Sequence, residues 1–474
     1  MAKKPVQLDE RGYRKYGMID NLAYAAGDFG CNMSFALKSY LTLFWTQFMG
    51  IDSVLMSGLL ILVNIWDAIN DPVIGSMVDA DKHQYKRNKF LQYIWVGSIG
   101  LLVAGALCYV PWTSAPYVVK CILFVAGYIL WDAFYTIANV PYGSMLSLIS
   151  EDAGDRASLS TFRSVGSMAG NILCMILVPM IIYDANQNIK GEVMFFMALV
   201  MGAIGFVCFQ FMIKNTVIRV DTSVRCNDEE TPKFNVVKAC VNFFKNRAAV
   251  GATLAPVGMF IGMYGAQTSS QIMWQAYFKN SQISGLMSTI SYLPMFLFMP
   301  FIRKIVSKWG KKEAVTVAST IMLIGYGLMV ILPMTPDSKG IAMYVACSLI
   351  AGIGNGIYQC VSWSLMADAM DYGEWKLGVR EEGTTYALHS FFRKLAQGIG
   401  PSIGLLVAVA LGYDESLKAA QTAQTALNMR YQTAVFYAIS GVLMFVGLVL
   451  IYNLDKKTLD KMNTELADRR AGNK

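Results

Sequence analysis

The chain contains 474 residues, of which 55% are apolar and only 15% are charged, and its formal net charge is +8. Soluble domains carry roughly 25% charged residues, so a chain of this length built from soluble domains is excluded. A disordered chain and a disulfide scaffold are excluded as well. The Lys and Arg residues stand in short clusters between apolar runs, which argues against a nucleic-acid-binding face.

Apolar runs long enough to cross a bilayer recur along the whole chain. A spanning helix needs about 20 mostly apolar residues, and by this criterion the sequence predicts twelve spans and an all-α membrane protein. In chain order the predicted helices begin near Asn21, Val54, Phe90, Tyr117, Leu159, Met194, Val250, Leu286, Glu313, Ile341, Thr384 and Gln432.

A long polar linker divides the twelve predicted helices into two six-helix halves. The predicted domains are an N-terminal half over residues 1–213, a cytoplasmic linker over 214–247, and a C-terminal half with a cytoplasmic tail over 248–474. Two such halves are typical of the major facilitator fold, in which substrate binds near the midplane between them. No GxxxxGK[ST] phosphate loop is present, which argues against ATP as the energy source.

The distribution of basic residues predicts the orientation of the chain. Cytoplasmic loops of membrane proteins carry an excess of Lys and Arg. Most of the 40 Lys and Arg residues fall on the side of the N-terminus, and five are assigned to the loops of the other side. We therefore expect a multi-pass protein of the cell (inner) membrane with both termini in the cytoplasm. The five basic residues assigned to loops on the opposite side are Lys190, Lys279, Lys339, Lys418 and Arg430.

The second predicted helix carries two carboxylates inside an apolar run. Asp67 and Asp71 are four residues apart and share one helix face, and Asn70 lies on the same side. Two carboxylates this close in a low dielectric repel each other unless a cation or a proton lies between them. Pro72 also frees the carbonyl of Ala68. This group of oxygen ligands predicts a site for Na⁺, Li⁺ or H⁺; solvated carboxylates at a helix end are the alternative.

The fourth predicted helix carries a matching polar stripe. Asp132, Thr136 and Asn139 follow the i, i+4, i+7 pattern of one helix face. This face would complete the cation site from the opposite side. A stripe that only packs the helix against a neighbour is the alternative.

Charged and amide side chains lie inside three further predicted helices. An ionisable group inside the membrane is costly, so it is a functional candidate by default. The alternative for Arg163 is a long side chain that reaches the helix end. These residues are Asp28, Asn32 and Lys38 in the first helix, Arg163 in the fifth, and His389, Arg393 and Lys394 in the eleventh.

Four stretches of the sequence resemble one transporter family. The stretch Trp66–Pro72 is similar to the signature of the glycoside–pentoside–hexuronide:cation symporters, the melibiose permease and glucuronide carrier group. Tyr24–Gly30, Asn139–Gly143 and Asp371–Lys376 agree with it. The resemblance extends from about Tyr16 to Lys457 and implies the major facilitator fold.

The resemblance implies two sites. Carried over by matching motif, the cation site contains Asp67, Asn70, Asp71 and Thr136, with Asp67 and Asp71 binding Na⁺ or H⁺. The implied sugar site contains Asn32, Asn139, Gly143, Arg163, His389 and Lys394. Asp28, Asp132 and Arg393 are added to the sugar site by their places in the helices.

Three positions depart from the melibiose permease pattern, which has acidic residues where this chain has Asn32 and Asn139 and a Trp where it has Gly143. The carboxylates that grip a galactoside are therefore missing, and melibiose is disfavoured. An anionic glycoside such as a hexuronide would neutralise Arg163 and Lys394. A neutral glycoside or pentoside remains equally open, because Asp28 or Asp132 would serve as an internal partner.

These observations predict a symporter that imports a sugar, glycoside or hexuronide with Na⁺ or H⁺ by alternating access. It is not expected to be an enzyme or to need a cofactor beyond the coupling ion. Its expected partners are a small sugar or glycoside, a monovalent cation and membrane lipid, but no nucleic acid. Two alternatives are a membrane enzyme acting on lipid-linked sugars, for which no catalytic cluster is apparent, and a sugar sensor that does not transport.

Overall fold

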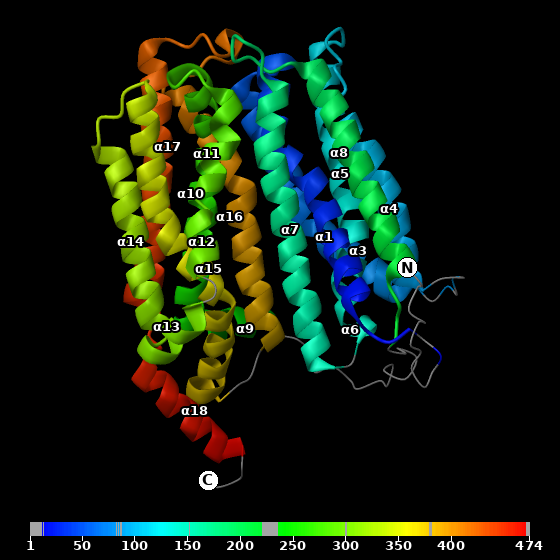
Figure 1. Cartoon of the computed structure of the whole chain (residues 1–474), viewed down its shortest axis with the longest axis vertical. Helices are drawn as coiled ribbons and strands as arrows, with labels where there is room; N and C mark the ends of the chain where they lie inside the picture. Colours follow the sequence, from blue (N-terminus) through cyan, green and yellow to red (C-terminus); the bar gives the residue numbers. More distant parts are fainter. Residues whose placement is uncertain are drawn as a thin grey trace, which may run out of the picture. The chain divides into compact units, whose positions relative to one another are not determined.

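The protein is helical throughout the part that its computed structural model describes, namely residues 12, 14–81, 83, 85, 88–150, 152–219, 236–298, 301–378 and 382–470 (Figure 1). These residues form no extended strand, and an isolated antiparallel bridge joins Tyr183 to Ile189. The centre of the predicted linker, residues 220–235, lies outside this part of the chain. The helical content agrees with the predicted all-α class.

The chain divides into two units. The first comprises residues 1–52 and 65–230, and the second comprises residues 53–64 and 231–474. The first turns of the second predicted helix therefore group with the second unit. The predicted halves over residues 1–213 and 248–474 stay a prediction.

In the first unit, α1 packs against α7 and α8, and α4 packs against α5 and α8. Its elements include one long helix, α3, whose first turns belong to the second unit. The elements are α1 (Met18–Phe35), η1 (Ala36–Tyr40), α2 (Leu41–Leu43), η2 (Phe44–Phe48), α3 (Ser53–Ala80), α4 (Lys89–Leu107), α5 (Tyr117–Ser144), α6 (Leu146–Ile149), α7 (Ala153–Ile182) and α8 (Gly191–Asn215).

In the second unit, α10 packs against α16 and α17, and α14 packs against α15 and α17. The elements are α9 (Val236–Lys245), α10 (Arg247–Ile272), η3 (Met273–Tyr277), η4 (Ser281–Ile283), α11 (Ser284–Ile290), α12 (Leu293–Phe298), α13 (Ile302–Trp309), α14 (Lys311–Ile331), α15 (Ser338–Leu377), α16 (Glu382–Ala410), η6 (Glu415–Leu417), α17 (Ala423–Phe445), η7 (Val446–Ile451) and α18 (Lys456–Arg470).

Among the described residues, nine helices are long and apolar enough to cross a membrane. They coincide with nine of the twelve predicted runs. The first run is instead broken into shorter pieces over residues 18–48, and the described residues of the eighth form α11, α12 and α13. The eleventh is α16, a continuous helix that carries His389, Arg393 and Lys394. Together these elements account for the twelve predicted helices.

Side-chain caps set several helix starts. The side chain of each capping residue accepts a hydrogen bond from a backbone N–H in the first turn, which the helix itself leaves without a partner. The caps are Asn88, Asp152, Asn246, Asp337 and Thr422.

The cap at Thr422 corrects one predicted boundary. The last spanning helix begins at Ala423 rather than near Gln432, because its capped first turns are polar and hydropathy does not detect them. Arg430 therefore lies inside α17 and is buried, and its assignment to an outer loop was wrong.

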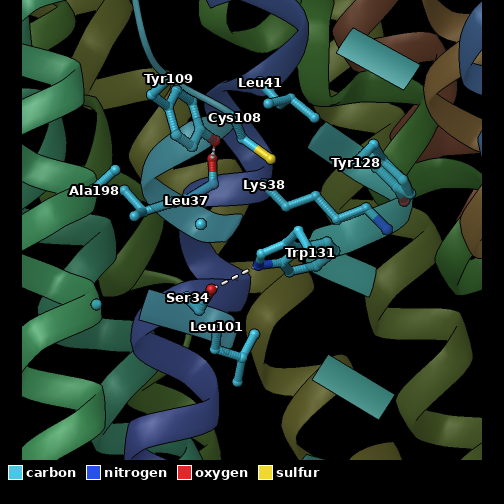
Figure 2. A pocket seen from close by; sticks show the side chains of 12 residues that line it. Ser34, Leu37, Lys38, Leu41, Leu101, Cys108, Tyr109, Tyr128, Trp131 and Ala198 are labelled. Carbon is cyan, nitrogen blue, oxygen red and sulfur yellow. Dashed lines mark hydrogen bonds between the residues drawn. The ribbon is translucent and has the colours of Figure 1, made fainter. Parts of the chain in front are cut away.

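The interior of the first unit contains a cavity between residues of α1, η1, α4, α5 and α8 (Figure 2). Trp131 Nε1 donates a hydrogen bond to Ser34 Oγ at 2.6 Å and so links α5 to α1. Lys38 also lines this cavity. The charged side chain of Lys38 therefore lies inside a mostly apolar helix bundle.

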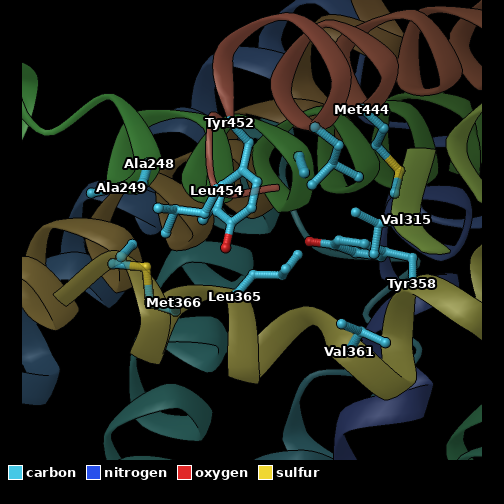
Figure 3. Close-up of a cluster of buried hydrophobic side chains, with 14 of the residues drawn as sticks. Ala248, Ala249, Val315, Tyr358, Val361, Leu365, Met366, Met444, Tyr452 and Leu454 are labelled. Atoms are coloured by element: carbon cyan, nitrogen blue, oxygen red, sulfur yellow. The ribbon is translucent and has the colours of Figure 1, made fainter. Parts of the chain in front are cut away.

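The second unit has a continuous apolar core (Figure 3). Small residues of α10, such as Ala248 and Ala249, are buried there beside Tyr452, Tyr358 and Leu365. Burial of such side chains removes apolar surface from solvent and packs the helices closely. Side chains of α10, α14, α15 and η7 all pack into this core.

Candidate functional site

Helix α3 presents two faces of different character. One face carries a row of exposed apolar side chains, as expected of a surface that contacts lipid. Asp67 and Asp71 lie on the opposite side of the helix by their spacing. This row includes Leu62, Ile65, Ile69, Val73 and Met77.

The structure brings the predicted cation ligands together with Asp132. Asn70 Nδ2 donates hydrogen bonds to Asp132 Oδ2 and to Thr136 Oγ1, both at 3.0 Å. Thr136 Oγ1 donates in turn to Asp71 Oδ1 at 2.9 Å. Asn70, Asp132 and Thr136 are buried. We refer to Asp67, Asn70, Asp71, Asp132 and Thr136 as the acidic cluster.

Asp67 has a partner that the sequence analysis did not assign. Lys38 Nζ lies 3.8 Å from Asp67 Oδ2. The same ammonium group lies over the rings of Tyr128 and Trp131, at 4.9 and 5.5 Å from their centroids (Figure 2). The described residues contain no three His, Cys, Asp or Glu side chains that converge on one metal-sized point. A cation here would rely on two carboxylates together with amide and hydroxyl oxygens.

A second polar group follows the contact between α1 and α7. Arg163 Nε lies 3.4 Å from Asp28 Oδ2. Asn32 Nδ2 donates to Ser167 Oγ at 2.9 Å, and Asn32 Oδ1 accepts from the amide of Asn171. We refer to Asp28, Asn32, Arg163, Ser167 and Asn171 as the polar strip. It offers a carboxylate, a guanidinium and two amides, which can donate to and accept from sugar hydroxyls.

Aromatic and small residues surround Arg163. Its guanidinium lies over the ring of Tyr142 at 4.9 Å, and Tyr142 stacks on Tyr24 with ring centroids 4.6 Å apart. A Cβ added at Gly143 would meet Arg163 Nη1 only at 3.9 Å, so there is room for a side chain at this position. Asn139 Oδ1 lies 3.9 Å from the thiol of Cys31. Asn139 and Gly143 therefore lie near the strip.

The remaining predicted residues lie on α16 in the second unit. His389 is buried, and its Nδ1 lies 3.0 Å from Thr253 Oγ1, so it connects α16 to α10. The guanidinium of Arg393 lies 5.9 Å from the ring centroid of Phe260. Lys394 is half-buried on the same helix.

The sequence analysis missed Ser167 and Asn171. Their spacing contained the signal, because Arg163, Ser167 and Asn171 are four residues apart and share one face of α7. The pairing of Lys38 with Asp67 had no comparable signal, since it joins separate helices.

A family model described as MFS/sugar transport protein matches residues 23–456 of the chain. The chain belongs to this family. Curated relatives cover nearly the same length. The transporter is 30% identical over 465 residues to the uncharacterized symporter YjmB of Bacillus subtilis (strain 168), with 96% of each chain covered.

Two further relatives carry substrate names. The transporter is 27% identical to the isoprimeverose transporter of Lactiplantibacillus pentosus, covering 92% of this chain and 89% of the relative. It is 24% identical to the glucuronide carrier protein homolog of Escherichia coli (strain K12), covering 95% of each. These relatives are transporters rather than enzymes, and they confirm the predicted symporter family.

Solved structures confirm the fold. A D-xylose-proton symporter superimposes with a TM-score of 0.60 at 14% identity, covering 93% of this chain and 98% of that chain. The nucleoside transporter NupG gives 0.57 at 15% identity, covering 92% and 100%. The predicted major facilitator fold and the multi-pass membrane class are therefore correct.

Proposed function

We propose that the transporter couples the entry of a monovalent cation, Na⁺ or H⁺, to the import of a sugar or glycoside by alternating access. The acidic cluster is the observation that carries this proposal. We place the transporter in the cell membrane, and the excess of Lys and Arg on the side of the N-terminus supports a cytoplasmic position for both termini.

The charge of the acidic cluster supports cation binding. It contains three carboxylates, and Lys38 Nζ lies 3.8 Å from one of them, Asp67. Carboxylates close together in a low dielectric repel one another, so a bound cation or proton stabilises the cluster. Carboxylate, amide and hydroxyl oxygens are also the ligands that hard cations prefer.

The polar strip supports a neutral substrate. Asp28 already supplies the counter-charge of Arg163 within the first unit, so a substrate carboxylate is not needed for neutrality. A neutral glycoside can accept hydrogen bonds from Arg163 and donate one to Asp28. We therefore propose a neutral glycoside or pentoside as the substrate class, with a hexuronide as the second candidate.

Gradient-driven uptake tests the coupling. Purified transporter is reconstituted into liposomes, and uptake from a panel of labelled sugars is measured with an imposed Na⁺ gradient, an imposed pH gradient, or neither. We expect accumulation above equilibrium with one of the two gradients. Uptake that never exceeds equilibrium for any transported sugar would reject the coupling.

Substitution of the ligands tests the role of the acidic cluster. Asp67→Asn and Asp71→Asn should each abolish accumulation while sugar binding is retained, because a cation ligand is removed but the polar strip is intact. Asp460→Asn, at an exposed position of α18, is the matched control and should accumulate sugar normally. Full accumulation by both cluster variants would contradict the proposal.

Competition tests the substrate class. A glucoside and the glucuronide with the same aglycone are compared as inhibitors of uptake. We expect the glucoside to inhibit at lower concentration. Stronger inhibition by the glucuronide would replace the neutral assignment with the anionic one, and Lys394→Gln should then erase most of that preference.

A further inference from the structure

Lys38 lies at an interruption of the first spanning segment. Helix α1 ends at Phe35, and Lys38 belongs to the 3₁₀ segment η1. In a 3₁₀ helix, residues three apart lie above one another, which places Phe35 over Lys38. The ring centroid of Phe35 is indeed 5.8 Å from Lys38 Nζ. A mid-helix 3₁₀ stretch of this kind often marks a functional hinge.

The ion pair between Lys38 and Asp67 is loose. Its 3.8 Å separation exceeds the 2.7–3.2 Å of an N–H···O hydrogen bond. The two side chains are 29% and 32% exposed, so neither is sealed from small ions. A pair of this geometry can exchange partners without the cost of breaking a buried hydrogen-bonded ion pair.

Aromatic rings provide a second favourable interaction for the ammonium group of Lys38. Lys38 Nζ is nearer to the ring centroid of Tyr128, at 4.9 Å, than to those of Trp131 and Phe35. Ring faces attract cations, and this attraction does not require Asp67. Lys38 can therefore leave the carboxylate and still be stabilised within the bundle (Figure 2).

We infer that Lys38 is a tethered cation of the acidic cluster, which occupies Asp67 when the coupling ion is absent and is displaced when that ion binds. The inference rests on the proposed function, because it presupposes that the cluster binds a cation. The geometry of Asn70 agrees with it. Asn70 turns its amide nitrogen toward Asp132 and Thr136, so this arrangement presents hydrogen-bond donors, not cation ligands, to the cluster.

Competition of this kind lowers the affinity for the ion. Any cation must displace the ammonium group before Asp67 becomes a ligand, and binding to a state that must first be created is weakened by its low population. A neutral residue at position 38 should remove this penalty. The variant Lys38→Met keeps an unbranched apolar side chain, one atom shorter than that of lysine, but removes its charge.

Direct ion binding tests the inference. NaCl is titrated, in exchange for choline chloride at constant ionic strength, into the purified full-length transporter. Binding is followed by calorimetry and by the rise in Tm. The apparent Kd for Na⁺ should fall at least about tenfold in Lys38→Met, the equivalent of ~1.4 kcal/mol. Lys38→Gln should behave in the same way if Lys38→Met does not fold.

Two controls isolate the charge at this position. Lys38→Arg keeps the charge and should leave the Na⁺ affinity near that of the wild type. Lys120→Met removes a lysine of the same unit whose Nζ donates to the carbonyl of Met49, and it should also have no effect. Adding Asp67→Asn to Lys38→Met should abolish the gain, because the two changes act on one pair.

Three outcomes would overturn the inference: unchanged or weaker Na⁺ affinity in folded neutral variants, a gain that survives Asp67→Asn, or no Na⁺ binding by either neutral variant. Gradient-driven uptake by the wild type distinguishes failure of this inference from failure of the proposed function. Coupled uptake with an unchanged Kd rejects the inference alone. Gradient-independent uptake together with Na⁺ binding gained by Lys38→Met rejects the coupling alone.

Discussion

The carboxylates of the first unit differ in how their charge is compensated. Asp28 lies beside Arg163, and Asp67 lies beside Lys38. Asp132 is buried and accepts a hydrogen bond from the amide of Asn70. An amide dipole compensates a buried charge less well than a full positive charge does. A bound cation would therefore stabilise the charge of Asp132.

Asp132→Asn tests this role. The change removes the charge but preserves the size of the side chain, so the apparent affinity for the coupling cation should weaken about tenfold, or ~1.4 kcal/mol. The maximal uptake rate should be nearly unchanged, because Asp132 acts through Asn70. The measurement is the Na⁺ or H⁺ dependence of uptake, with Asp184→Asn as the control. Loss of uptake even at saturating cation would instead assign Asp132 to the transport step.

The side chain of Arg430 caps the C-terminal end of α14. Arg430 is buried in α17, and its Nη2 donates to the carbonyls of Met329 and Leu332 at the end of α14. Helix C-termini leave carbonyl groups without intrahelical partners. Arg430→Met should therefore lower the free energy of unfolding by about 1–3 kcal/mol. Thermal unfolding in detergent measures this, Arg430→Lys should lose less, and an unchanged Tm would contradict the capping role.

Close packing between helices determines where the polar strip lies. A Cβ at Gly166 of α7 would lie 2.2 Å from the carbonyl oxygen of Ala25 in α1, and one at Gly170 would lie 3.0 Å from that of Phe29. Small residues four apart allow two membrane helices to approach at backbone distance. This approach brings Arg163 within reach of Asp28.

Gly166→Leu should therefore disturb both stability and binding. Overpacking should lower the free energy of unfolding by about 1–3 kcal/mol, because α1 must move away from α7. Sugar affinity should fall with it, since the Asp28–Arg163 pair spans the same contact. The measurements are Tm and sugar titration. Gly327→Leu, where a Cβ would meet nothing within 4 Å, is the control, and equal effects at both positions would reject the packing argument.

At the scale of the whole molecule, coupling is a reciprocal free energy. If the cation increases the affinity for sugar by some factor, sugar must increase the affinity for the cation by the same factor. Titrating sugar with and without saturating Na⁺, and Na⁺ with and without saturating sugar, should give equal ratios of Kd, expected at roughly 5–150-fold. Ratios of one in both directions would show two independent sites and would reject symport by this cluster.

The sequence alone determined the membrane class, the twelve-helix count and which polar residues of α3 and α5 share a helix face. These follow from local rules, because a bilayer selects apolar runs by length and a helix places residues four apart on one face. The clustering of Asn70, Asp71 and Thr136 was anticipated for the same reason. Their role in cation binding stays a prediction.

Only the tertiary structure decided the partners of the charges. Lys38 meets Asp67, Arg163 meets Asp28, and Arg430 turns inward to cap α14. Each of these contacts joins separate helices, and its geometry depends on how closely their backbones approach and on a 3₁₀ segment that re-aims one side chain. The periodicity of the sequence predicts the helix face on which a residue lies. Which residue it contacts on a neighbouring helix depends on how helices far apart in the chain pack together.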